Sequence, residues 1–196
     1  MYRSVTFEEL QERREIELDF RSMTGLFNAA DCERIIGRFS DASSVKSRIT
    51  WGDQSQFERS TDISWVEPND ETMWLFRKLS STVTRLNEEF FRFSLDGNIR
   101  SFQLSRYEVG QGYDWHCDLG RRASRRKLSV SVQLSDSASY DGGDLEFFRN
   151  DNAVARATRN RGSITAFPSW AIHRVSRIRE GRRWSLVGWL EGPPFK

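Results

Sequence analysis

Histidine and cysteine are scarce in this chain of 196 residues, which has two of each. Two cysteines, Cys32 and Cys117, cannot build the disulfide framework of a small secreted protein. No apolar run approaches the roughly 18–20 residues that cross a bilayer. Residues 1–10 also lack the apolar core of a signal peptide. These absences argue against a disulfide scaffold and predict a protein of the reducing cytoplasm that does not enter a membrane.

A strong excess of one charge is also missing, because 30 basic residues face 28 acidic ones and the net charge is +2. Charge over the whole molecule therefore gives no argument for nucleic acid as a partner. A hydrophobic content of 37% and a charged content of 30% are typical of a folded globular protein and not of a disordered one. The length suits one domain with a core of its own. We expect residues 1–196 to form a single domain.

Helical patterns dominate residues 1–98. Residues 28–31 predict a helix start, because Asn28 is a good N-cap and an acid follows three residues later. A strand is expected at 62–66. Residues 68–70 then open the longest predicted helix, whose apolar side chains recur every three or four positions: Leu75, Leu79, Val83, Leu86 and Phe90.

Short strands separated by glycine-containing turns replace this pattern over residues 99–196. The most regular alternation lies in 128–134 and puts its apolar residues on one face: Leu128, Val130, Val132 and Leu134. Further strands are expected at 102–109, 145–148, 163–167, 172–175 and 184–190. So many short strands indicate a sandwich or a jelly roll. With the earlier helices bracing this core, the fold class predicted is α+β.

The two histidines and one nearby acid form the most informative pattern in the chain. His116 and Asp118 flank Cys117, so on an extended strand both would face one way and the cysteine the other. His173 can join them from a remote strand. Two imidazoles and a carboxylate are the ligand set that holds Fe(II) and leaves coordination positions open. The triplet alone also fits a surface histidine beside an acid, but all three together predict a non-haem iron site.

The surrounding sequence resembles the 2-oxoglutarate/Fe(II)-dependent oxygenases, in particular the prolyl-4-hydroxylase-like group. The resemblance covers about residues 101–190 and rests on the order and spacing of several blocks. These blocks are Tyr107–Tyr113, His116–Asp118, Lys127–Ser135, Tyr140–Phe147, Gly162–Ser169, His173–Val175 and Gly181–Trp184. The resemblance implies a double-stranded β-helix (jelly roll), with His116, Asp118 and His173 as the iron ligands.

The resemblance also implies an anchor for the cosubstrate. Arg183 stands where the family has a Lys or Arg that binds the distal carboxylate of 2-oxoglutarate, as a bidentate guanidinium pair would. Arg182 would face the other side of the strand, and a register error of one would exchange the two. Tyr107 matches a family tyrosine whose hydroxyl helps to hold the same carboxylate. By analogy, Gln103 and Leu104 would line this pocket.

The activity implied is a dioxygenase reaction with Fe(II), 2-oxoglutarate and O2. Succinate and CO2 would be released, and an unactivated C–H bond of the substrate would be hydroxylated. Related halogenases replace the acid of the triad with a small residue, so Asp118 favours hydroxylation. No catalytic residue beyond the metal ligands is expected. The substrate predicted is a protein side chain, a peptide or an amino-acid-like small molecule.

Two other functions compete with this one. A nucleic-acid demethylase of the same superfamily would carry an Arg-x-Asn-x-Thr-x-Arg run near its C-terminal arginine, and residues 183–189 do not match it. Nucleic acid is therefore not the expected partner. A non-enzymatic jelly-roll module with a structural metal or none would differ by failing to bind 2-oxoglutarate.

Two features bear on the substrate without identifying it. Residues 121–127 hold five basic side chains directly after the first two iron ligands, and this segment is expected to be a loop. It would attract an acidic group or serve only as a solvated surface. Four tryptophans also fall in or near expected loops, where they frame a pocket or pack at its rim: Trp51, Trp65, Trp115 and Trp170.

Overall fold

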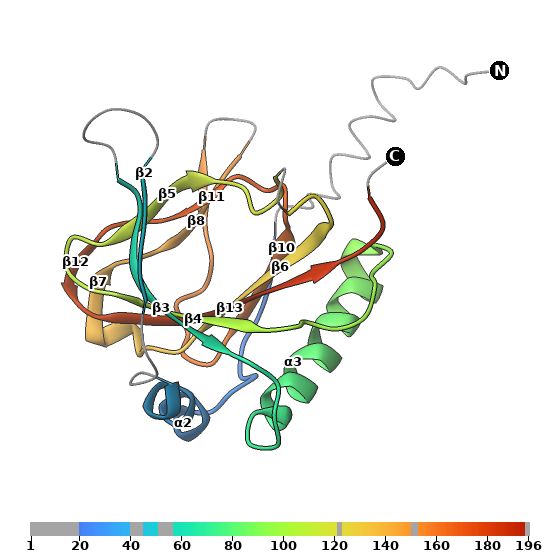
Figure 1. The fold of residues 1–196 in the computed structure, drawn as a ribbon. Coiled ribbons are helices and arrows are strands. Elements are labelled where there is room, and N and C mark those ends of the chain that lie inside the picture. Colours follow the sequence, from blue (N-terminus) through green and yellow to red (C-terminus); the bar gives the residue numbers. More distant parts are fainter. Residues whose placement is uncertain (1–19, 40–44, 51–56, 121–122, 150–152, 195–196) are drawn as a thin grey trace, which may run out of the picture.

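A computed structural model describes residues 20–39, 45–50, 57–120, 123–149 and 153–194 (Figure 1). Among the described residues of the first half, two α-helices and a π-helical turn are found: α2 (Ala29–Phe39), α3 (Met73–Leu86) and η2 (Asn87–Phe91). The strands before residue 120 are β1 (Arg21–Met23), β2 (Val45–Thr50), β3 (Phe57–Val66), β4 (Phe102–Tyr107) and β5 (Gly112–His116). Those after it are β6 (Arg126–Gln133), β7 (Tyr140–Gly142), β8 (Leu145–Phe148), β9 (Val154–Arg156), β10 (Ile164–Pro168), β11 (His173–Val175), β12 (Ile178–Gly181) and β13 (Arg183–Glu191), with a 3-10 turn, η3 (Ser137–Ser139), before β7.

Antiparallel pairing joins most of these strands into one curled sheet. Its order is β1-β10-β6-β13-β4-β3-β5-β11-β8-β9, with β2 paired to β3, and β12 and β7 form a separate ribbon. The sheet folds back on itself so that the layer with β5, β11 and β8 lies over the layer with β4, β13 and β6 (Figure 1). The jelly-roll prediction is confirmed, and the space between the two layers holds the candidate site.

The main hydrophobic core lies outside that space, between the β4–β13–β6–β10 layer and the helices (Figure 1). The predicted alternation in β6 is confirmed, because Leu128, Val130 and Val132 are all buried in this core. Their helix partners are on the apolar faces of α2 and α3: Cys32, Ile35, Leu75, Leu79, Val83 and Leu86. Burial of this stripe fixes the helices to the back of the sheet.

The start of α2 follows the predicted capping chemistry, whereas α3 begins at Met73, later than the expected start at 68–70, and its N-cap residue Thr72 makes no side-chain cap hydrogen bond. The Asn28 side chain accepts a hydrogen bond from the Asp31 amide at 2.8 Å, and the Asp31 carboxylate accepts from the Asn28 amide at 3.3 Å. Before α3, the Asn69 side chain accepts from the amides of Glu71 and Thr72. Within the described residues, no helix is long and apolar enough to span a membrane.

The end of the long helix differs from the prediction. Phe90, expected on the buried face, is 40% exposed, and Phe91 is buried instead. The last turn, η2, is π-helical, and the wider turn shifts the side-chain register relative to α3. Arg92 closes it with a left-handed backbone at φ 55°.

The region before residue 99 is more than the helical support that its sequence indicates. β1 pairs with β10, and β2 pairs with β3, so this region extends the jelly-roll sheet. β3, whose second half is the strand expected at 62–66, pairs with β4 along Asp62–Val66 and with β5 at Arg59–Ser60. One strand from the first half therefore joins the two layers that enclose the site.

The glycine pair at Gly142 and Gly143 serves the backbone, as predicted. Both have positive φ, at 74° and 64°. A Cβ on Gly142 would lie 2.1 Å from the carbonyl oxygen of Arg177, so only glycine fits this close approach.

Candidate active site

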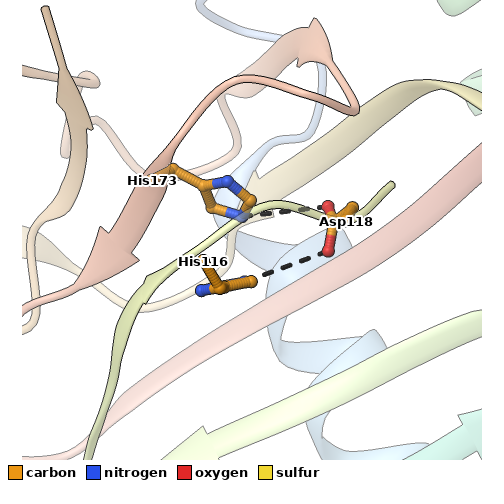
Figure 2. A group of neighbouring side chains, drawn as sticks. All are labelled: His116, Asp118 and His173. Carbon is orange, nitrogen blue, oxygen red and sulfur yellow. Dashed lines mark ion pairs between the residues drawn. The ribbon is translucent and has the colours of Figure 1, made fainter. Parts of the chain in front are cut away.

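His116, Asp118 and His173 converge between the two layers, as Figure 2 shows. His116 is the last residue of β5 and His173 the first of β11, and these two residues are paired directly across the antiparallel strands. Asp118 follows two residues after β5, and its backbone N–H donates to the Ser169 carbonyl at 2.9 Å. One potential ligand atom from each side chain lies within 4.8 Å of the other two.

The distances suit a single metal ion. The Nε2 atom of His116 is 3.9 Å from Oδ1 of Asp118, and Nε2 of His173 is 3.8 Å from Oδ2. Two metal–ligand bonds of about 2.1 Å each span up to about 4.2 Å, so one ion can bridge both gaps. Two imidazole nitrogens and a carboxylate on one side of an ion form a facial set that suits Fe(II). The donor set therefore fits the metal that the sequence predicts.

Backbone carbonyls fix the tautomer of both histidines. Nδ1 of His116 lies 2.7 Å from the Asp114 carbonyl oxygen, and Nδ1 of His173 lies 2.9 Å from that of Ala171. A carbonyl only accepts, so each Nδ1 must carry the proton and donate it. Each Nε2 then faces Asp118, and in the neutral imidazole it is the atom that a metal would take.

The Asp118 carboxylate is oriented by two serines. Ser129 of β6 donates to its Oδ2 at 2.7 Å, and Ser169 lies 3.0 Å from the Ser129 hydroxyl. Burial of the Asp118 side chain favours its protonated form. The charges of His173 and His116 and the hydrogen bond from Ser129 outweigh burial and lower the pKa of the carboxyl below its usual value. The carboxyl is therefore held as the anion that binds a cation.

An irregularity in β5 brings a fourth side chain into the site. His173 pairs with His116 but Val175 pairs with Tyr113, so β5 has one residue more than β11 over this stretch. Such a bulge turns Tyr113 and His116 to the same face although they are three residues apart. The Tyr113 ring stacks on the His116 imidazole with centroids 3.5 Å apart. Strict alternation along the strand would have placed the two on opposite faces.

A pocket of about 240 Å³ extends from the three ligands between the layers. Arg183 and Tyr107 both line it, and these residues are paired across β13 and β4. Arg183 is 3% exposed, whereas the side chain of Arg182 is 53% exposed and forms an ion pair with Glu108. The sequence preference for Arg183 over Arg182 as the residue facing the pocket agrees with this geometry.

Polar side chains hold the Arg183 guanidinium in place. Its Nε donates to Oε1 of Gln133 at 3.1 Å, and Nη1 donates to the Ser185 hydroxyl at 3.3 Å. The Gln133 amide is itself fixed, because its Nε2 donates to the Tyr140 hydroxyl at 3.0 Å. The Arg183 guanidinium carbon lies 5.8 Å from the centroid of the Tyr107 ring. No carboxylate of the described residues forms an ion pair with Arg183, so its charge faces the pocket without a counter-ion.

Several pocket residues were missed from the sequence, and one prediction was wrong. Gln103 lines the pocket as expected, but Leu104 belongs to the hydrophobic core on the other face of β4, because neighbouring strand residues alternate. Arg126 and Trp189 also line the pocket, with the guanidinium 3.9 Å above the indole centroid. Neither residue carries a motif in the sequence, and the register of β13 that turns Trp189 toward the pocket could not be read from the sequence.

The basic segment and the tryptophans have separate positions. Within 121–127, residues 121–122 lie outside the described residues and Arg126 begins β6, so the segment is not wholly a loop. Of the four loop tryptophans, Trp65 lines the pocket, and Trp51 lies outside the described residues. Trp115 stacks under Arg174, and Trp170 packs on Phe93.

Comparison with known proteins agrees with this geometry. Residues 102–191 match the model of the 2OG-Fe(II) oxygenase superfamily. A PKHD-type hydroxylase of Synechococcus sp. (strain CC9605) is 31% identical over 145 residues, which cover 74% of this chain and 64% of that protein. A PKHD-type hydroxylase of Synechococcus elongatus is 27% identical over 178 residues, covering 87% and 77%. The chain thus spans less than two thirds of the length of the strain CC9605 protein.

Solved structures share the fold. A prolyl-4-hydroxylase of Pseudomonas putida aligns with TM-score 0.72 and 18% identity over 89% of this chain and 93% of that one. A prolyl hydroxylase of Trichoplax adhaerens, in complex with a hypoxia inducible factor peptide fragment, aligns with TM-score 0.72 and 16% identity over 96% and 94%. The jelly roll, the His-Asp-His cluster and the match over 102–191 thus make this chain similar to the 2OG-Fe(II) oxygenase superfamily, and its fold is that of the prolyl-4-hydroxylases.

Proposed function

We propose that this protein is a 2-oxoglutarate- and Fe(II)-dependent dioxygenase that hydroxylates a C–H bond of a protein side chain, a peptide or an amino-acid-like molecule. The observation that carries the proposal is one pocket that contains both a facial ligand set and a buried arginine without a carboxylate partner among the described residues. A structural metal site needs the first feature and has no use for the second.

In this proposal His116, Asp118 and His173 hold Fe(II). Fe(II), 2-oxoglutarate and O2 together would supply the oxidising chemistry, in which one oxygen atom enters the substrate and the other enters succinate as CO2 is released. Arg183 binds the distal carboxylate of 2-oxoglutarate through its guanidinium, and the Tyr107 hydroxyl donates to the same group. A bidentate, charge-assisted pair in a buried site would hold 2-oxoglutarate in one orientation relative to the metal bound by the three ligand residues.

A peptide or protein substrate is favoured by the space beside the metal site. A second cavity of about 150 Å³ adjoins the pocket, and Trp65, Arg126 and Trp189 line both. A substrate whose reactive residue lies near the iron therefore has room to continue past these three side chains. The peptide bound to the Trichoplax adhaerens prolyl hydroxylase supports the same class of substrate. A free amino acid would fill only the inner pocket.

The demethylase alternative gains no support. The run Arg183–Trp189 lacks the motif of that group, and the two Synechococcus relatives described above are hydroxylases by name. A cytoplasmic setting is proposed from the cysteines, since both Cys32 and Cys117 are free thiols and a reducing compartment keeps iron as Fe(II).

The test supplies the purified full chain with Fe(II), ascorbate, 2-oxoglutarate and air, and offers two substrate arms: a peptide library and the free amino acids. We expect succinate formation that peptides stimulate, with a gain of one oxygen atom in the peptide mass, and neither in the His173→Ala variant. If the metal binds but 2-oxoglutarate neither binds nor is consumed, the protein is a metal-binding module and the proposal is wrong.

A further inference from the structure

A further cavity, larger than the two described above, lies beside the pocket that contains His116, Asp118 and His173. It has a volume of about 390 Å³, and Tyr113 and Val175 line both cavities. Three arginines and two serines contribute to its walls, and we call it the arginine cavity after them: Arg174, Arg177, Arg179, Ser60 and Ser176. It is formed at the point where β3, β5, β11 and the start of β12 meet.

This cavity opens on the side of the β5–β11 layer opposite the cluster of His116, Asp118 and His173. His173 and Val175 point inward, to the ligand cluster and to the small core around Tyr107. Arg174 and Ser176 alternate with them and therefore point outward. The arginine cavity is thus separate from the site that contains Arg183, and the two share only a wall.

The floor of the cavity is backbone. A Cβ on Gly112 would lie 2.9 Å from the Val175 carbonyl oxygen and 3.3 Å from Cα of Arg177, so no side chain fits there. Gly110, at φ 80°, donates its N–H to the Ile178 carbonyl at 2.9 Å and completes the turn. Glycines at both positions leave a hollow that the arginine side chains border and do not fill.

The cations of this cavity differ in their partners. Arg179 forms a bidentate ion pair with Asp141, so its donors are largely used. Arg174 gives its Nε to Glu146 at 2.6 Å and stacks over the Trp115 ring at 4.4 Å, which orients the rest of its guanidinium. Arg177 donates to the Gly110 carbonyl at 3.2 Å and forms no ion pair with a carboxylate of the described residues.

The acid within the cavity does not neutralise these groups. Asp114 lines the wall, but its Oδ1 accepts the backbone N–H of Trp115 at 2.8 Å, and it forms no ion pair with an arginine of the described residues. Ser176 accepts from the Asp144 amide at 2.9 Å, so its hydroxyl proton remains available to donate. Arg177, the outer edge of Arg174 and the Ser176 hydroxyl together offer hydrogen-bond donors around one hollow.

We propose that the arginine cavity is a second anion site, which binds a carboxylate or phosphate group of an acidic ligand. Arginine forks match the geometry of both groups, and a donor set that includes one unpaired guanidinium favours an anion over a neutral ligand. The ligand is either an acidic segment of a polypeptide or a free small dianion. It binds one wall away from the iron, next to Tyr113, which stacks on the ligand His116.

Calorimetric titration of the full chain tests the site. The protein is first loaded with diamagnetic Zn(II) and saturating 2-oxoglutarate, so that any anion affinity of Arg183 is already satisfied and the amide signals near the metal stay sharp. Inorganic phosphate and acetyl-Glu-Glu-amide are titrated at constant ionic strength, and amide NMR shifts of Gly110 and Gly112 give the location. Arg177→Gln removes the unpaired cation at an exposed position, and Arg182→Gln removes an equal charge outside the cavity as the matched control.

We expect saturable binding that shifts both glycine amides, weakens about tenfold in Arg177→Gln and stays within about twofold in Arg182→Gln. Tighter binding of the dipeptide identifies an acidic polypeptide segment as the source of the anion, and tighter binding of phosphate identifies a free dianion. Absence of saturable binding by both probes overturns the proposal. Equal weakening in the two variants overturns it as well, because the effect is then one of net charge.

Discussion

The two faces of the β4–β13–β6 layer have opposite characters although the same strands form both. On one face Leu128, Val130 and Leu186 pack against the helices in a dry core. On the other face Ser129, Ser131 and Ser185 are equally buried but look toward the ligand cluster and Arg183. Burial alone therefore does not separate stability from function here. The side of the strand does, because successive residues alternate between the core and the site.

The metal ligands should show the largest effect on the site face. Replacing His116, Asp118 or His173 with Ala removes one of three protein ligands, so we expect turnover to fall below detection and Fe(II) binding to weaken. The apoprotein should unfold at nearly the same temperature as the wild type, because none of these side chains belongs to the main core. Activity assays and calorimetry check both halves. Retained turnover in any of the three would refute the triad.

The opposite face should respond in stability and not in cosubstrate binding. Leu186 is fully buried among the helix-facing residues, so Leu186→Ala should cost about 2–5 kcal/mol of unfolding free energy. Its neighbour Ser185 gives the matched control. Ser185→Ala should cost at most about 1 kcal/mol while raising the KM for 2-oxoglutarate, since Ser185 accepts from Arg183. Denaturant unfolding measures the stability of Leu186→Ala and Ser185→Ala. Similar losses of unfolding free energy in the two variants would contradict the difference between the two faces.

Arg183, the first residue of β13, and Arg182, which directly precedes it, provide the sharpest pair of neighbouring residues. Arg183→Ala should raise the KM for 2-oxoglutarate about 10- to 100-fold, which is the loss of one charge-assisted pair of about 1.5–3 kcal/mol. Arg182→Ala should change it less than about twofold, because its side chain is solvent-exposed and paired with Glu108. Steady-state kinetics at saturating substrate measure both. The reverse order would mean that the strand register is displaced by one residue.

Ser129 should show a smaller effect that acts through Asp118. Ser129→Ala removes the hydroxyl that donates to Oδ2, and loss of such an outer hydrogen bond weakens metal binding about 10- to 100-fold. Ser131→Ala, on the same face of β6 but without a bond to a ligand residue, is the control. Metal titration measures the weakened affinity of Ser129→Ala for Fe(II). Saturating Fe(II) should then restore most of the turnover of this variant. If the two variants bind metal equally, Ser129 does not orient the carboxylate.

Much of the jelly-roll region, residues 99–196, was predictable because its signals are local. The alternation in 128–134, the turn glycines and the His-x-Asp spacing each depend on neighbouring residues, and all three are found in the structure. Asn28 capping was predictable for the same reason. Arg183 was preferred over Arg182 through the family resemblance, and its burial agrees with that preference.

Features that depend on distant contacts were not predictable. β1 has only three residues and exists because β10 offers it an edge. β2, with the sequence Val-Lys-Ser-Arg-Ile-Thr, lacks a clear apolar alternation and pairs with β3. Tyr113 reaches the site because β5 has a bulge opposite β11. The residues next to Tyr113 carry no sequence pattern that predicts this bulge. The partners in each case lie far away in sequence.

The most direct measurement of the central claim is an anaerobic titration of the apoprotein with Fe(II) and then 2-oxoglutarate, followed by visible absorption. We predict a weak charge-transfer band of chelated 2-oxoglutarate that is lost in His116→Ala and His173→Ala, and that needs far more 2-oxoglutarate in Arg183→Ala than in Arg182→Ala. Iron binding without any such band would contradict the account, because Arg183 and Tyr107 would then have no cosubstrate to hold.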